Sequence, residues 1–216
     1  MHIEPGFLSQ TTVGAAGVAA SALLSAHAPA LWRRPALLLR TLLAGGFFSV
    51  LMQAWHLPVG PSELHLVGAM PIYLLFGYLP TLFGFALGLL AQGLLFEPQD
   101  LMHLAVNALT LIVPLMAVHH TLGRTLSQKN LSAGRLLQLD GAYYAGVTLM
   151  VGFWLSQGLQ ATALADWAAF AASYLALVAV EPLLTVALVR GSRRLDAAGW
   201  AGLCLDERLT VGARAI

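Results

Sequence analysis

Seven apolar stretches, separated by short polar segments, occupy most of this chain and restrict what it can fold into. A membrane crossing needs about 20 predominantly apolar residues in helical form, and most of these stretches reach or approach that length. They run over residues 6–31, 36–55, 66–78, 81–96, 104–122, 136–157 and 167–189. The sequence therefore predicts an all-α membrane protein, a bundle of about seven transmembrane helices.

The composition agrees with that prediction and excludes several other classes. Of 216 residues, 58% are hydrophobic and only 10% are charged, whereas soluble domains carry roughly 25% charged residues. The net charge of +1 gives no indication of nucleic-acid binding. Because Cys204 is the single cysteine, neither a disulfide framework nor a cysteine-rich metal site is expected. We expect one domain over residues 1–216, with the helical bundle in residues 1–195 and a cytoplasmic tail in residues 196–216.

The distribution of positive charge predicts the orientation of the bundle. All eleven lysines and arginines lie after the first, the fifth or the seventh stretch, which places them on one side of a seven-helix bundle. The positive-inside rule makes that side cytoplasmic, so we expect the N-terminus outside and the C-terminus in the cytoplasm. The first stretch is rich in Gly, Ala, Ser and Thr, residues that let helices approach one another closely. We therefore expect it in the centre of the bundle.

The first two residues supply three nitrogen ligands. The chain opens without the positive charge of a signal peptide, so we expect it to begin the mature protein. Because His2 is large, bacterial processing should leave Met1 and its free α-amine in place. The amine, the amide nitrogen and His2 Nδ1 then close a five-membered and a six-membered ring on one metal ion. Such tetragonal nitrogen ligation suits Cu(II), Ni(II) and, less readily, Co(II).

A fourth nitrogen would complete the plane, and His65 is the natural donor. It follows a segment rich in Gly and Pro between the second and third stretches, which the charge pattern places outside together with Met1. Non-helical backbone at membrane depth is tolerated where protein buries it, so this loop is expected to fold back into the bundle. The candidate metal ligands are therefore Met1, His2 and His65.

Several other polar residues have two readings on sequence alone. Glu181 lies in the middle of a stretch, where an ionisable group marks either a functional site or a structural hydrogen bond. Asn107, Gln53 and Gln92 either orient the metal ligands from outside or bond between helices. His103, near the outer end of the fifth stretch, either passes metal inward or lies at the membrane interface.

Five segments of the chain together resemble one family of membrane proteins. They are similar to the CbiM/NikM type of substrate-binding membrane subunits, the cobalt- and nickel-specific S components of energy-coupling-factor (ECF) transporters. The segments are Met1-His2-Ile3 with Gly6-Phe7-Leu8, Ser62-x-x-His65-x-x-Gly68, Gln92-x-Leu94-Leu95-Phe96, Ala105-x-Asn107 and Glu181-x-x-x-Thr185. The resemblance implies seven helices, one of them an additional N-terminal helix in the bundle centre. It also implies that Met1, His2 and His65 hold the metal.

The resemblance further implies a multi-pass protein of the bacterial cytoplasmic (inner) membrane that binds Co(II) or Ni(II) for import. Its partners would be a transmembrane coupling subunit and two cytoplasmic ATPase subunits; the need for a small accessory membrane subunit stays open. No nucleotide-binding or hydrolase motif occurs in the sequence, so we expect neither an enzyme nor an organic cofactor. The alternative function is an integral-membrane electron-transfer or haem protein, which needs two histidines facing each other on neighbouring helices. The sequence does not decide between cobalt, nickel and copper, nor the oligomeric state.

Overall fold

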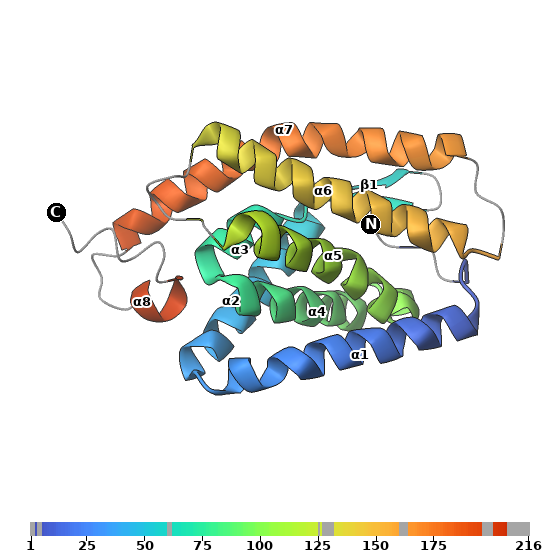
Figure 1. Ribbon diagram of the computed structural model, residues 1–216, viewed down its shortest axis with the longest axis horizontal. Coiled ribbons are helices and arrows are strands. Elements are labelled where there is room, and N and C mark those ends of the chain that lie inside the picture. Colours follow the sequence, from blue (N-terminus) through green and yellow to red (C-terminus); the bar gives the residue numbers. More distant parts are fainter. Residues whose placement is uncertain are drawn as a thin grey trace.

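The computed structural model is a helical bundle with one small β-hairpin (Figure 1). It describes residues 3, 6–59, 62–124, 126, 132–159, 164–195 and 201–206. The α-helices are α1 (Gln10–Trp32), α2 (Pro35–Ala54), α3 (Ala69–Phe76), α4 (Tyr78–Leu95), α5 (Leu104–Val118), α6 (Ala133–Ser156), α7 (Leu164–Leu195) and α8 (Ala201–Cys204). A 3-10 turn, η1 (Pro98–His103), precedes α5, and a π-helical turn, η2 (His119–Gly123), follows it.

Each of the seven predicted stretches overlaps one of the helices α1 to α7, which confirms the predicted fold class. Among the described residues, five helical segments are long and apolar enough to cross a membrane. They are Gln10–Trp32, Pro35–Ala54, Tyr78–Leu95, Pro98–Gly123 and Leu164–Ser192. The chain is therefore a multi-pass membrane protein.

Local sequence signals explain where several helices begin. Ser9 caps α1 by accepting a hydrogen bond from the Thr12 amide, and Ser132 caps α6 by accepting one from the Arg135 amide. The break between α3 and α4 falls at Gly77, whose φ of 92° is a conformation that favours glycine. The third predicted stretch therefore forms the short helix α3, and the fourth forms the longer helix α4.

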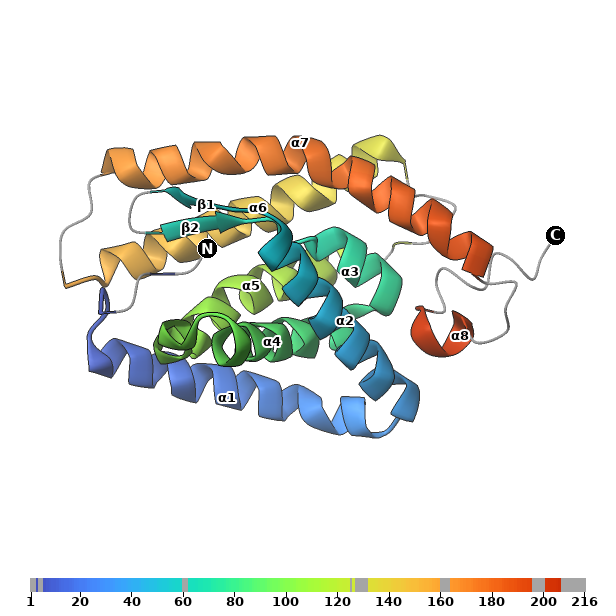
Figure 2. The same cartoon turned by 180° about the vertical axis from the view of Figure 1, so that it is seen from behind.

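The prediction that the first helix lies in the bundle centre is wrong. Figures 1 and 2 show α1 along one edge of the molecule, and only Ala16, Ala20 and Leu31 are buried among its residues. Small side chains allow a close approach on the face that meets a neighbour, here mainly α5, but they do not require the remaining faces to be covered. The centre is instead occupied by α3, all 8 residues of which are buried.

Helices α2 and α4 pack closely against each other. A Cβ atom added to Gly84 would lie 2.7 Å from the Cβ atom of Ala44, and one added to Gly88 would lie 2.4 Å from the Phe48 ring. The Ser49 hydroxyl also donates to the Gly88 carbonyl over 3.2 Å. The glycines therefore let the two backbones approach, as small residues do between membrane helices.

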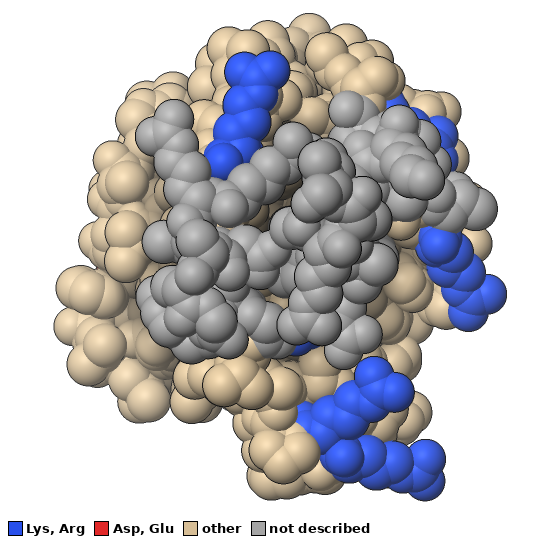
Figure 3. Space-filling model, turned by 90° about the vertical axis from the view of Figure 1, so that its left-hand side faces the viewer, with Lys and Arg blue, Asp and Glu red and all other residues tan. Residues whose placement is uncertain are grey.

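The positive charges gather at one end of the bundle. Figure 3 views the end that carries α8, and the charged side chains visible on it are lysine or arginine. The described arginines lie after α1, near the start of α2, after η2, at the start of α6 and near the end of α7. This clustering agrees with the charge pattern of the sequence, and the assignment of this end to the cytoplasm stays a prediction.

The tail boundary also stays a prediction, because residues 196–200 and 207–216 lie outside the described residues. The described part of the tail is docked on the basic end of the bundle. Arg40 Nε donates to the Leu203 carbonyl over 3.2 Å, and the Asp206 amide donates to the Leu75 carbonyl over 2.7 Å.

Candidate metal site

The loop between α2 and α3 is a β-hairpin that lies against α7. Strands β1 (His56–Val59) and β2 (Ser62–His65) pair antiparallel, and both contact α7. The pairing satisfies backbone groups that would otherwise be costly to bury in a membrane bundle. Its register places His56 opposite His65 and Pro58 opposite Glu63. The hairpin therefore carries the predicted ligand His65 at the inner end of β2, just before α3.

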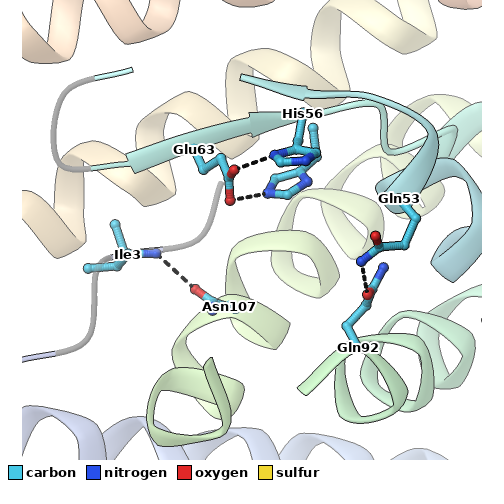
Figure 4. A network of polar contacts seen from close by, with 7 residues as sticks. Ile3, Gln53, His56, Glu63, Gln92 and Asn107 are labelled. Atoms are coloured by element: carbon cyan, nitrogen blue, oxygen red, sulfur yellow. Dashed lines mark hydrogen bonds and ion pairs between the residues drawn. The ribbon is translucent and has the colours of Figure 1, made fainter. Parts of the chain in front are cut away.

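The His65 ring is buried and held by a carboxylate. Its Nε2 atom lies 2.9 Å from Glu63 Oε2, and His56 Nδ1 lies 2.7 Å from Glu63 Oε1 (Figure 4). The two imidazoles stack with their centroids 5.7 Å apart, but only 5% of the His65 side chain is exposed, against 48% of that of His56.

This arrangement fixes which nitrogen of His65 is available to a metal ion. A carboxylate only accepts hydrogen bonds, so Nε2 of His65 is the protonated nitrogen and Nδ1 carries the lone pair. Histidines that bind metals commonly donate their other ring N–H to a carboxylate, which fixes the tautomer and the orientation of the ring. The structure thus gives His65 the surroundings of a metal ligand.

The predicted ligands Met1 and His2 lie outside the described residues. The next residue, Ile3, is completely buried. Its amide donates to Asn107 Oδ1 over 3.3 Å, and its carbonyl accepts from His103 Nδ1 over 2.9 Å. Figure 4 shows the contact between Ile3 and Asn107 in the same close-up as Glu63 and His56. The chain immediately after the predicted chelate is therefore inside the bundle and bound to the start of α5.

Glu181 is also buried, and it binds the segment that follows His65. Its Oε1 atom accepts from the Met70 amide over 3.2 Å, and its Oε2 atom accepts from the Tyr144 hydroxyl. The carboxyl group also interacts with the Gly68 and Ala69 amides. A carboxylate at a helix N-terminus is favourable because the first amides of a helix have no partner within it. Glu181 on α7 thus anchors the first turn of α3.

Other predicted candidates have contacts elsewhere. Gln53 Nε2 donates to Gln92 Oε1 over 2.7 Å, and Gln92 Nε2 donates to the Ser49 carbonyl over 3.0 Å, so this pair joins α2 to α4 (Figure 4).

The described histidines do not support the haem alternative. Those whose rings contact each other are His56 with His65, on one hairpin, and His119 with His120, which are consecutive residues. Neither pair joins two neighbouring helices, as axial ligation of a haem would require. Within the described residues, no group of three or more His, Cys, Asp or Glu side chains is arranged to hold a metal ion. The described part of the candidate site therefore contains a single candidate ligand, His65.

A protein-family model described as the cobalt uptake substrate-specific transmembrane region, CbiM, matches residues 2–197. This chain belongs to the CbiM family. The match confirms the resemblance drawn from the five sequence segments. Comparisons with curated proteins and with solved structures gave no match. The CbiM-family chain is thus a substrate-specific membrane component for cobalt uptake.

Proposed function

We propose that this CbiM-family chain binds Co(II) or Ni(II) as its cargo through four nitrogens. These are the α-amine of Met1, the amide nitrogen between Met1 and His2, His2 Nδ1 and a ring nitrogen of His65. The observation that carries the proposal is the burial of His65, whose Nε2 atom donates to Glu63. The burial of Ile3 inside the bundle supports it, because the proposed Met1–His2 chelate is covalently joined to this residue.

The proposed ligand set has a definite metal preference. The amide nitrogen binds only after losing its proton, and metals differ widely in their ability to displace it. Cu(II), Ni(II) and Co(II) accept a tetragonal arrangement of nitrogens, whereas Mg(II) prefers six oxygens in an octahedron and Zn(II) is usually tetrahedral. The site is therefore suited to the cargo that the family description names.

We propose further that the chain acts as the S component of an ECF transporter in the bacterial inner membrane. A transmembrane coupling subunit and two cytoplasmic ATPases would then supply the energy for uptake. The family supports this role, and the clustered arginines at one end favour an orientation with that end in the cytoplasm and the N-terminus outside. Co-expression with a coupling subunit and ATPases, followed by purification of the intact complex, tests the assembly.

Cobalt binding by the purified protein should release protons and should not be reversed by zinc. The metal competes with protons for the amide and imidazole nitrogens, so we expect affinity to rise from mildly acidic to alkaline pH. Competition titrations at several pH values, on protein with a free N-terminus, measure both effects. Copper should bind tightly in vitro whatever the cargo is, because it stands highest in the usual affinity order. A cobalt affinity independent of pH, or displacement of cobalt by equimolar zinc, would refute the amide-ligated site.

Glu181→Gln should weaken cobalt binding by about 10-fold, the lower end of the range for residues that orient metal ligands. The amide keeps one acceptor oxygen for the first turn of α3 but loses the second acceptor, which binds the Tyr144 hydroxyl. We expect the N-terminus of α3, and with it His65, to be held less firmly. Ser173→Ala is the matched control on α7, because the Ser173 hydroxyl donates to the Phe170 carbonyl within its own helix. Calorimetric titrations that gave Glu181→Gln the affinity of the control would show that this anchor does not reach the metal site.

A further inference from the structure

Two residues at the start of α5 form hydrogen bonds to the main chain of Ile3. Asn107 Oδ1 accepts the hydrogen bond from the Ile3 amide, and His103 Nδ1 donates to the Ile3 carbonyl. His103 is the N-cap residue of α5, and Asn107 lies in the first turn of that helix. Residues four apart on a helix lie on the same face, so both side chains can reach the backbone of a single residue.

Both His103 and Asn107 are buried. His103 is 0% exposed and Asn107 is 1% exposed, and the hydrogen bonds to Ile3 are buried as well. A polar side chain in such surroundings is costly unless it is hydrogen-bonded. Chain termini are normally poorly ordered unless something ties them down, and ordering a residue costs about 1–2 kcal/mol of backbone entropy. The two hydrogen bonds and the burial of the Ile3 side chain are the contacts that offset this cost.

The hydrogen bond to Ile3 also determines the protonation of His103. A carbonyl oxygen only accepts, so Nδ1 of His103 carries the proton and Nε2 carries a lone pair. This Nε2 atom is buried, and it has no hydrogen-bond partner within the described part of the chain. A second role for His103, direct binding of the metal through Nε2, must therefore be separated from its role in holding Ile3.

We infer that His103 and Asn107 are positioning residues that fix the backbone of Ile3 and thereby bring the Met1–His2 chelate to His65. The inference rests on the proposed function. The terminal dipeptide carries three of the four nitrogens and would bind metal even when detached from the bundle. His103 and Asn107 make the fourth nitrogen available, because His65 can coordinate the same ion only if the N-terminal segment is held in place.

This role predicts a bounded and non-additive loss of affinity. Without the hydrogen bonds to Ile3, the chelate should retain its three nitrogens and be held less firmly near His65, so the affinities of His103→Leu and Asn107→Leu should fall toward that of His65→Ala without passing it. Outer residues of metal sites typically contribute about 10–100-fold, and we expect both variants in this range. In a His65→Ala background the same two substitutions should have little further effect, since residues that act through one ligand are coupled rather than additive.

The test is a double-mutant cycle on the full chain, purified with a free N-terminus and titrated with Co(II) while its visible absorption is recorded. His103→Asn is the conservative variant, because its amide nitrogen can donate to the Ile3 carbonyl from the place of Nδ1 while Nε2 is lost. We expect it to keep affinity and spectrum close to those of the parent. Gln92→Leu is the matched control, a buried amide that bonds to Gln53 and Ser49, and it should also retain the parent affinity.

Each outcome of the cycle has a definite meaning. Parent-like affinity in both leucine variants, with His65→Ala still weak, would overturn the inference and leave the proposed site intact. If His103→Asn is as weak as His103→Leu, or if their effects add to that of His65→Ala, His103 is itself a ligand and the positioning role is wrong. Parent-like affinity in His65→Ala would overturn both the site and the inference. Should His103→Leu fail to fold, Asn107→Leu, which is close in size to the parent residue, completes the cycle.

Discussion

Adding one residue in front of Met1 is expected to abolish tight cobalt binding while leaving the bundle intact. The extension converts the α-amine into an amide and moves the free amine away from His2. The proposed site then loses a ligand and both of its chelate rings are rearranged, so the loss should exceed the ~10–100-fold typical of changes outside the ligand shell. Calorimetric titration of tagged and untagged protein measures the difference.

The control for this experiment is the same residue added after Ile216, at the opposite end of the chain. That variant should bind cobalt like the parent. The thermal stability of both variants should be unchanged, because the hydrogen bonds of Ile3 to Asn107 and His103 involve neither Met1 nor His2. An extended N-terminus that binds cobalt as tightly as the free one would eliminate the α-amine as a ligand and, with it, the chelate.

The helices could be predicted from the sequence because hydrophobic length is a local property. Each apolar stretch is long enough to require hydrogen bonding within itself, and the break at Gly77 is marked by that glycine and by Pro80. The position of α1 could not be read in the same way. Its small residues show that close packing is possible, but which neighbour it meets depends on the other helices, and the structure places it at the edge beside α5.

The surroundings of the candidate site required the fold. His65 could be singled out as a ligand from its place in the loop, but nothing local links it to His56, nine positions earlier. Only the register of the hairpin pairs the two residues and lets Glu63 bind both rings. The alternation of histidine and acid in Glu63-Leu64-His65 was the available signal, since residues two apart on a strand share a face.

Tertiary contacts were likewise needed to choose between the two interpretations of His103 and of Glu181. His103 was also compatible with an interfacial position, yet it is completely buried and bonds to Ile3. Glu181 was a candidate for function or for a local hydrogen bond, and its partners are the first turn of α3 and Tyr144, on other helices. These contacts join residues between 37 and 111 positions apart and leave no periodic pattern in a sequence, so they could not have been predicted from it.

His65→Ala should lower the cobalt affinity by more than any other single histidine substitution outside the first two residues. It removes one of the four proposed nitrogens, whereas residues that only orient ligands typically contribute about 10–100-fold. The hairpin offers a matched control, because His56 shares the carboxylate of Glu63 but is half exposed. We expect His56→Ala to stay within that range and His120→Ala, exposed at the start of η2, to bind like the parent.

Comparing His65→Ala with His56→Ala distinguishes a histidine that binds the metal from one that only helps to hold the hairpin. If His65 binds the metal, His65→Ala should also change the visible spectrum of bound cobalt, because a nitrogen is replaced by water, while His56→Ala should leave the spectrum unchanged. Glu63→Gln gives an intermediate case. It retains an acceptor oxygen for one imidazole but loses the negative charge that makes His65 a stronger ligand. Equal affinities and identical spectra for His65→Ala and His56→Ala would mean that the hairpin contributes no ligand, and that the chelate of Met1 and His2 must find its fourth nitrogen elsewhere.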